Sequence, residues 1–167
     1  MDRKRMWKIM TLNIRKMESK DVAALTNMEQ QCFTDPWSEK MMADLLDSSW
    51  DEVWVLEESE SGDGTENLVG YINYRFIAGE GELMRIAVLP SMRGRGYSRK
   101  LMDVMVKAAA ENGVSDITLE VRAGNAPAIG LYKSYGFVSE AVRKGDYDNP
   151  TEDADIMWLR GLPSIPT

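Results

Sequence analysis

The chain has 167 residues, of which 44% are hydrophobic and 28% charged, and its formal net charge is −7 at pH 7. This size and composition fit one globular domain with one core. The acidic balance argues against a general nucleic-acid-binding protein, and no apolar run approaches the length of a membrane span. We therefore expect neither nucleic acid nor a membrane as a partner.

The absence of histidine restricts the chemistry that the chain can perform. It excludes Ser-His-Asp and Cys-His catalysis and histidine metal clusters, so proton transfer must use Glu, Asp, Tyr, Lys or water. Cys32 is the single cysteine and makes no internal disulfide, which favours the cytoplasm, and we interpret it as a buried or half-buried thiol. The first ten residues carry charge but no apolar stretch, so export is not expected.

The first half of the chain reads as strands and short helices. Pro36 interrupts the pattern after the first helix, and Ser38 is placed to cap the next one. An acidic, glycine-containing turn over 59–67 predicts a hairpin connection. The predicted elements are a strand over 11–16, a helix over 20–31, a helix through 41–45, and strands at 52–57, 68–76 and 82–88.

The second half begins with a basic glycine turn and then alternates strands with helices. The predicted elements are a helix over 98–112, a strand over 117–121, a helix over 125–135, a strand over 137–142, a polar loop over 145–155 and a last strand over 156–159. The strand-helix-strand run from Leu83 to Val121 predicts a parallel pair, whereas the earlier, closely spaced strands predict antiparallel pairing. The fold class is α/β with a mixed sheet. We divide the chain into an N-terminal extension (1–10), one domain (11–160) and a tail (161–167).

A candidate anion site lies where the strand ending at Val88 runs into the glycine turn. Gly94 and Gly96 let the main chain curl, and the turn opens a helix whose N-terminal N–H groups and dipole attract anions. Four of the eight residues from Arg93 to Lys100 are basic. A pyrophosphate has the right sign and size for such a turn.

Other interpretations of this turn remain open. A dinucleotide fingerprint would need a third glycine and an earlier place in the chain, and a Walker loop would need G-K-[ST] at its end. The plainest alternative is a glycine turn with solvated arginines, because short glycine motifs are weak evidence by themselves.

Glu120 is a candidate general base. Along the strand over 117–121, Ile117, Leu119 and Val121 share one face, and Glu120 lies on the other. A central strand covered on both faces would partly desolvate Glu120 and raise its pKa. The alternative is that Glu120 only pairs with Arg122 in solvent.

Asn125 and Tyr132 are placed to act on one extended ligand. Asn125 can cap the next helix, and Tyr132 follows seven residues later, close to two full turns, so both point to one side. Taken alone, Asn125 could be a pure helix cap and Tyr132 a core aromatic.

Together, these segments resemble the GCN5-related N-acetyltransferase (GNAT) superfamily. The resemblance is carried by V-x-P-x-x-R-G-x-G, which begins at Val88, and by N-x-P-A-I-x-L-Y-x-x-x-G-F, which begins at Asn125. The segments PWSEK (36–40), LEVRAGN (119–125) and P-x-E-D-A (150–154) are similar to the bacterial RimI type, the ribosomal-protein-alanine N-acetyltransferases. The resemblance covers residues 12–159 and implies a mixed sheet of six to seven strands with helices on both faces.

The resemblance also implies a role for each matching residue. The co-substrate would be acetyl-CoA, with no metal, and the acceptor would be a protein N-terminus, that of a ribosomal protein beginning with alanine. Glu120 would be the proton acceptor and Tyr132 the proton donor. The donor-binding residues would be Ile86, Ala87, Val88, Arg93, Gly94, Arg95, Gly96, Tyr97, Ser98, Arg99 and Asn125, and the loops around Trp37 and Tyr147 would shape the peptide entrance.

Two departures from the family pattern bear on this assignment. Ser98 stands where Gly or Ala is usual, and Asp146 stands where the first of two adjacent tyrosines is often found. Ser98 bears on donor affinity, and Asp146 bears on peptide recognition. We expect a monomer or weak dimer. Two alternatives stay open: an enzyme that acetylates a small amine such as a polyamine or an antibiotic, and a non-catalytic acyl-CoA-binding module.

Overall fold

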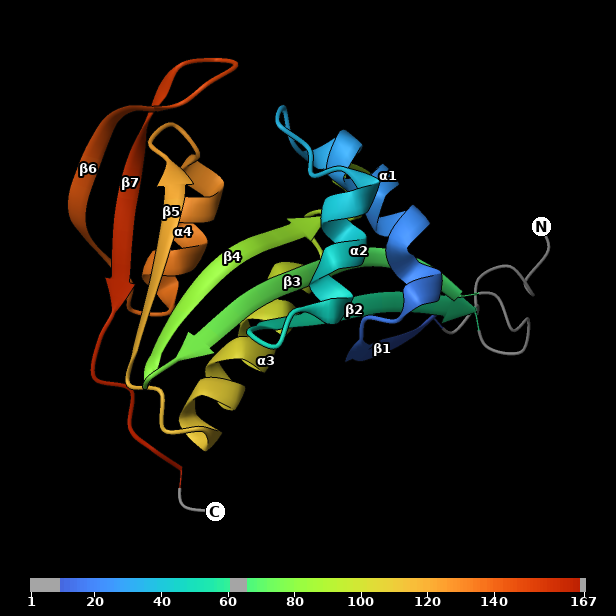
Figure 1. Cartoon of the computed structure of the whole chain (residues 1–167), viewed down its shortest axis with the longest axis horizontal. Helices are drawn as coiled ribbons and strands as arrows, with labels where there is room; N and C mark the ends of the chain where they lie inside the picture. The colour runs from blue at the N-terminus through green and yellow to red at the C-terminus, as the bar shows by residue number, and fades with distance from the viewer. Residues whose placement is uncertain (1–9, 61–65, 166–167) are drawn as a thin grey trace, which may run out of the picture. The chain divides into compact units, whose positions relative to one another are not determined.

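The computed structural model describes residues 10–60 and 66–165, and Figure 1 labels its elements. The strands are β1 Met10–Lys16, β2 Asp51–Glu60, β3 Glu66–Ile77, β4 Glu80–Val88, β5 Asp116–Arg122, β6 Val138–Tyr147 and β7 Glu152–Leu159. The helices are α1 Val22–Cys32, α2 Glu39–Asp47, α3 Tyr97–Glu111 and α4 Ala126–Ser134, with short 3-10 helices η2 at Ser19–Asp21 and η3 at Pro90–Met92.

Within these residues the strands form one seven-stranded sheet in the order β1-β2-β3-β4-β5-β7-β6. β1 and β2 are antiparallel, β4 and β5 are parallel, and β7 is antiparallel to both β5 and β6. The predicted α/β class, the mixed sheet and the parallel pair are therefore confirmed. No helix of the described part combines the length and hydropathy that crossing a membrane requires.

The described residues gather into two compact units. Unit 1 comprises those in the ranges 10–48, 53–72 and 86–101, and unit 2 comprises those in 49–52, 73–85 and 102–165. Unit 1 holds α1, α2, most of β2, the end of β4 and the glycine turn. Unit 2 holds β5, α4, β6 and β7.

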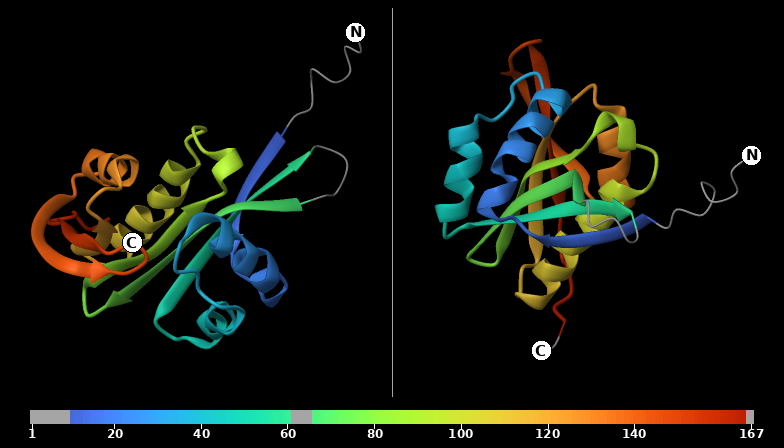
Figure 2. Two further views of the ribbon diagram at one scale, coloured as in Figure 1. Left: turned by 90° about the horizontal axis from the view of Figure 1, so that it is seen from above. Right: turned by 90° about the vertical axis from the view of Figure 1, so that its right-hand side faces the viewer.

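The core of unit 1 forms where α1 and α2 pack on the sheet. Ser38 caps α2 as predicted, because its Oγ accepts the Met41 N–H at 3.1 Å. The left view of Figure 2 shows α1 and α2 together on one side of β2 and β3. Their buried apolar side chains form one cluster with the strands, consisting of Met17, Leu25, Met28, Met42, Val53, Val55, Tyr71 and Ala87.

The other face of unit 1 carries the start of α3. Gly70 precedes Tyr71 on β3, so a side chain at 70 would point to the opposite face of the sheet. A Cβ at Gly70 would lie 2.9 Å from the Ala87 carbonyl oxygen and 3.2 Å from Leu101 of α3. Glycine thus permits the close approach of α3, and the prediction of helices on both faces is confirmed.

The buried apolar side chains of unit 2 include residues of β5, of α4 and of the rest of α3. Ile117, Leu119 and Val121 are buried on one face of β5, as their alternation predicts. Met102 and Met105 of α3 are buried in the same unit, and the ring centroids of Tyr132 and Phe137 lie 6.0 Å apart.

The predicted polar loop over 145–155 is wrong in extent, because β6 continues to Tyr147 and β7 already begins at Glu152. Charged residues disfavour strands, but here they have partners. Asp153 accepts the Gly145 N–H at 2.9 Å, and the Ser139 hydroxyl donates to Asp155. These bonds and the β6–β7 ladder hold a polar segment extended.

The segments predicted to flank the domain are only partly described. Most of the proposed N-terminal extension (1–10) lies outside the described residues; Met10 already belongs to β1. In the proposed tail, the N–H groups of Leu162 and Ile165 donate to the Ser115 and Ala110 carbonyls at 2.8 and 3.0 Å.

Candidate active site

The end of β4 in unit 1 presents main-chain groups that β5 does not use. The parallel ladder joins only Glu80–Leu83 to Asp116–Leu119, so the last five residues of β4 lie beyond it. Ala87 and Val88 are buried and Ile86 is half-buried. The Val88 carbonyl accepts the Cys32 thiol at 3.5 Å and the Arg93 Nε at 3.2 Å. Cys32 is thus the half-buried thiol that the sequence indicated.

The glycine turn has the backbone that its sequence predicts. Gly94 and Gly96 have φ of +82° and +79°, in the left-handed region that favours glycine. A Cβ at either position would meet nothing within 4 Å, so conformation rather than crowding demands glycine here. α3 begins at Tyr97, directly after the turn. Its first-turn N–H groups form the kind of helix start at which anions bind.

Several side chains of the glycine turn bond to other parts of the protein, which the sequence did not indicate. Arg93 bonds to the Val88 carbonyl, and Arg95 lies 3.9 Å from Glu58 of β2. Tyr97 is buried and its hydroxyl donates to Glu58 at 2.8 Å. Burial, and then this bond to a carboxylate, raise the pKa of Tyr97. Of the predicted donor-binding residues, Tyr97 can therefore offer only its main chain, whereas Arg99 is exposed and Ser98 is half-buried.

Glu120 in unit 2 is more exposed than a strand covered on both faces would leave it. It lies on the face of β5 opposite Ile117 and Leu119, as expected, but its side chain is 37% exposed. It accepts a hydrogen bond of 2.7 Å from Arg143 of β6. The alternative partner, Arg122, is engaged elsewhere. Glu120 is thus an accessible carboxylate beside a cation.

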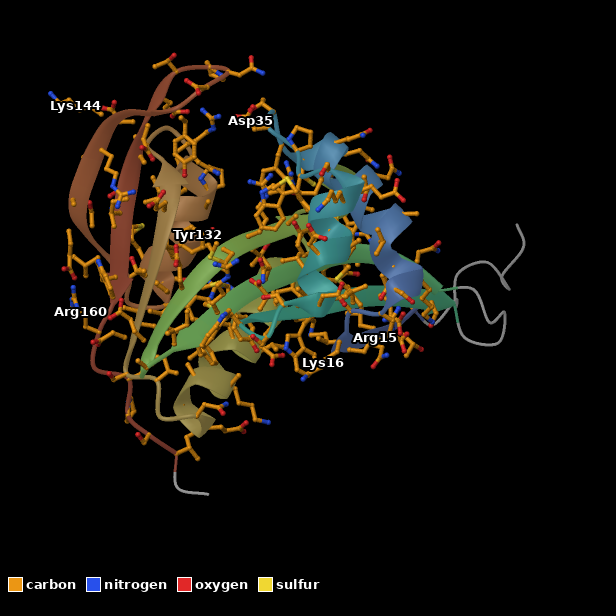
Figure 3. All side chains as sticks on the ribbon, in the orientation of Figure 1. Arg15, Lys16, Asp35, Tyr132, Lys144 and Arg160 are labelled. Carbon is orange, nitrogen blue, oxygen red and sulfur yellow. The ribbon has the colours of Figure 1, made fainter. Side chains whose placement is uncertain are left out.

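Asn125 and Tyr132 occupy the two ends of α4. The Asn125 Oδ1 accepts the Ala128 N–H at 3.3 Å, so Asn125 is an N-cap, and its side chain is exposed. Tyr132, labelled in Figure 3, is 6% exposed. Within the described part of the chain its hydroxyl makes no hydrogen bond. Burial, and then the neighbouring Tyr147, raise the pKa of Tyr132, so the phenol keeps its proton.

Arg122 organises the connection between β6 and β7. Its guanidinium donates to the Asp148 and Pro150 carbonyls at 2.7 and 2.8 Å and lies 4.6 Å from the centre of the Tyr147 ring. Burial raises the pKa of Tyr147, and the negative charge of Glu120 raises it further. Glu120, Tyr132 and Tyr147 of unit 2 are therefore electrostatic neighbours. The sequence did not indicate this role of Arg122.

Trp37 lies on the α1–α2 connection of unit 1, which also carries Asp35 (Figure 3). Its side chain is half-buried against the core cluster, and its main-chain N–H donates to Glu29 Oε1 at 3.1 Å. Glu29 is fully buried on α1. A buried carboxylate thus fixes the connection, a contact that helical spacing alone could not reveal.

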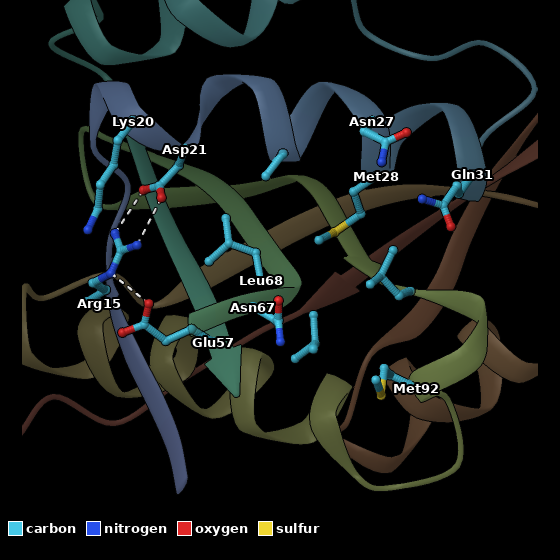
Figure 4. A pocket seen from close by; sticks show the side chains of 13 residues that line it. Arg15, Lys20, Asp21, Asn27, Met28, Gln31, Glu57, Asn67, Leu68 and Met92 are labelled. Atoms are coloured by element: carbon cyan, nitrogen blue, oxygen red, sulfur yellow. Dashed lines mark hydrogen bonds and ion pairs between the residues drawn. The ribbon is translucent and has the colours of Figure 1, made fainter. Parts of the chain in front are cut away.

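A cavity of about 530 Å³ in unit 1 has no predicted site residue in its lining, although Leu89 and Met92, the chain neighbours of Val88 and Arg93, do line it (Figure 4). Arg15 forms one wall, donating to Asp21 with both terminal nitrogens at 2.8 Å and to Glu57 with Nε at 3.1 Å. One guanidinium thus bonds to two buried carboxylates. The other wall carries side chains of α1, β3 and the segment after β4, among them Met28, Leu68 and Met92.

Comparison with known proteins identifies related chains. A family model described as "Acetyltransferase (GNAT) family" matches residues 22–137. The ribosomal protein bS18-alanine N-acetyltransferase of Escherichia coli (strain K12) is 32% identical over 149 residues, which cover 87% of this chain and 95% of that protein. The crystal structure of the ribosomal-protein-S18-alanine N-acetyltransferase from Escherichia coli matches with a TM-score of 0.80 and 30% identity over 94% of this chain and 97% of that one. Arabidopsis thaliana NAA60 in complex with a bisubstrate analogue matches in fold, with a TM-score of 0.81 at 19% identity over 90% and 98% of the two chains.

Proposed function

Because the chain belongs to the acetyltransferase (GNAT) family and is an N-acetyltransferase, we propose that it transfers the acetyl group of acetyl-CoA to the N-terminal α-amine of a protein. The acceptor would be the N-terminal alanine of a small-subunit ribosomal protein. The name of the Escherichia coli relative, a ribosomal protein bS18-alanine N-acetyltransferase, supports this acceptor.

The observation that carries the donor half of the proposal is the end of β4 followed by the glycine turn. Five residues of β4 lie beyond the ladder with β5, so their main-chain groups can bind the pantetheine arm. The main chain from Gly94 to Arg99 would hold the diphosphate, helped by the α3 dipole. Asn125 would contact the donor with its amide nitrogen, since its oxygen caps α4.

Glu120 would accept the proton of the acceptor amine, directly or through a water. An α-ammonium has a pKa of about 7.7–8.0 and is not nucleophilic while protonated. An exposed carboxylate can reach such a group, and Arg143 orients it. The freed amine would attack the thioester carbonyl directly, without an acyl-enzyme, and a main-chain N–H near Val88 would stabilise the oxyanion.

Tyr132 would donate a proton to the thiolate that leaves. Its raised pKa keeps the hydroxyl protonated, and the absence of a hydrogen bond from it within the described residues leaves it able to donate. The roles of these two residues are general acid-base catalysis and positioning.

The side chains of the β6–β7 region argue for a peptide over a polyamine acceptor. Asp153, Asp155 and Glu152 already accept hydrogen bonds from Gly145, Ser139 and Gly124. Fewer carboxylates are therefore available to hold a polycation. Tyr147, stacked with Arg122, is instead placed to contact a peptide.

The test is an acetyl-transfer assay on the purified chain. Acetyl-CoA is offered with a basic peptide that begins with alanine, with the same peptide bearing a blocked N-terminus, and with spermidine, and thiol release and product mass are measured. The free peptide should gain one acetyl group at its α-amine, and the blocked peptide should gain none. Faster transfer to spermidine, or to a lysine side chain, would contradict the acceptor assignment.

A further inference from the structure

Glu58 of β2 is a buried carboxylate beneath the glycine turn. It is 5% exposed, and its two oxygens have different partners. Oε2 accepts the Tyr97 hydroxyl at 2.8 Å, and Oε1 lies 3.9 Å from an Arg95 terminal nitrogen. Tyr97 and Arg95 flank Gly96, whose φ is +79°. The Glu58 side chain thus contacts both chain neighbours of Gly96.

We propose that Glu58 is a positioning residue for the diphosphate-binding turn: by holding Tyr97 and Arg95 it fixes the main-chain N–H groups at the start of α3. This inference rests on the proposed function, in which that turn binds acetyl-CoA. Burial of Tyr97 and its charge-assisted bond make this attachment firm. The Arg95 contact is longer and Arg95 is 50% exposed, so the bond to Tyr97 carries most of this attachment.

Whether removal of Glu58 weakens or tightens coenzyme A binding distinguishes a positioning role from a simple charge effect. Glu58 places a negative charge next to a site for a negatively charged ligand, so Coulomb's law alone predicts that its removal tightens binding. Positioning predicts the opposite, because N–H groups that are no longer fixed must be ordered when the ligand binds.

The preceding residue provides a matched control. Glu57 is 4% exposed on the same strand, but adjacent strand residues point to opposite faces of the sheet. Its oxygens accept from Asn13 and Arg15, on the α1 side. Glu57→Gln removes the same charge without touching the turn.

The experiment measures the affinity of the full chain for coenzyme A by calorimetry. Glu58→Ala should weaken binding by about tenfold, and Tyr97→Phe, which removes one hydroxyl, by about threefold. Glu58→Gln keeps an acceptor for Tyr97 and should recover most of the affinity, and Glu57→Gln should bind like wild type. In the turnover assay, Glu58→Ala should raise KM for acetyl-CoA and leave kcat and KM for the peptide at their wild-type values. With S-acetylpantetheine, which lacks the diphosphate, the loss caused by Glu58→Ala should be much smaller than with acetyl-CoA.

The outcomes separate the two hypotheses. Absence of coenzyme A binding by wild type would overturn the proposed function and this inference with it. Wild-type binding together with unchanged or tighter binding by Glu58→Ala and Tyr97→Phe would overturn the positioning role alone. If Glu57→Gln weakened coenzyme A binding as much as Glu58→Ala, the effect would be a general one of removing a buried charge. That result would also overturn the positioning role.

Discussion

Replacing Tyr132 with phenylalanine separates its proposed catalytic role from its place in the core. The ring is buried and packs 6.0 Å from that of Phe137, and phenylalanine retains both features. The hydroxyl makes no hydrogen bond within the described part of the chain, so its loss should change the free energy of unfolding by less than about 0.5 kcal/mol. A general acid contributes roughly 10²–10⁴-fold, so kcat should fall by at least about a hundredfold, or ~2.7 kcal/mol.

The pH dependence gives a second readout of the same residue. Burial and Tyr147 raise the pKa of Tyr132, and the protonated phenol is the form that donates. Deprotonation of Tyr132 should therefore cause no fall in wild-type kcat up to about pH 10, the ordinary pKa of tyrosine. A fall with an apparent pKa of about 9 that Tyr132→Phe abolishes would contradict the raised pKa.

The control for Tyr132→Phe is Tyr135→Phe, at the end of the same helix. The Tyr135 hydroxyl donates to Asp103 at 2.6 Å, so this variant should lose about 1 kcal/mol and about 2–4 °C in Tm while keeping kcat. Stopped-flow thiol release and thermal unfolding on both variants complete the comparison. Wild-type kcat in Tyr132→Phe would refute the acid role, because the thiolate would then leave unaided.

Three further predictions concern the base, the buried ion pairs and the turn. Glu120→Gln should lower kcat and flatten the rise of rate with pH while KM for acetyl-CoA stays constant, and Glu140→Gln, an exposed carboxylate on β6, should leave the pH profile as it is. Burial raises the pKa of Asp21, but the hydrogen bond and charge of Arg15 lower it more, so its net pKa is below the usual value. The stabilisation is then present above about pH 4 and is lost as pH falls through the lowered pKa, so urea unfolding of Asp21→Asn should show a deficit of about 3 kcal/mol at pH 7 that shrinks in acid. Gly96→Ala forces a side chain into the left-handed region and should cost about 1–2 kcal/mol in thermal unfolding and weaken coenzyme A binding, and full affinity in that variant would count against the turn as the anion site.

Local patterns predicted most of the architecture, because they encode local physics. The alternation along β5 placed Ile117 and Leu119 in the core, and the cap residues Ser38 and Asn125 each accept the N–H that their position predicts. Gly94 and Gly96 have the positive φ that their motif requires. Each of these follows from a few neighbouring residues.

The wrong and missed parts depend on partners far along the chain. Glu120 was expected to be partly desolvated by a covered sheet face, but no periodicity along β5 reports what lies over that face, and its partner Arg143 is 23 residues away. The bond between Glu58 and Tyr97 spans 39 residues, so a run of two glutamates at the end of a strand gave no sign of it. The polar start of β7 was missed because its carboxylates are satisfied by Gly145, Ser139 and Gly124 only after the chain folds.

Among the predicted site residues, too, local features were predicted correctly and contacts with distant residues were missed. The helix predicted from Asn125 onward is present as α4, with Asn125 as its N-cap and Tyr132 within it. The spacing could not show that Tyr97 faces inward, because a tyrosine after a glycine turn can lie on either side of the helix. Nor could it show that Trp37 is held by the buried Glu29.

The grip of Arg122 on the β6–β7 connection has a practical consequence for redesign. Arg122 bonds to the carbonyl oxygens of Asp148 and Pro150, which every amino acid possesses, so this support does not depend on the side chain at 148. In the proposed function this connection contacts the peptide, so libraries that vary Asp146, Asp148 and Thr151 should alter which peptides are accepted without collapsing the loop. The main-chain support of this connection is separate from the side chains proposed to select the peptide, so those side chains can be varied.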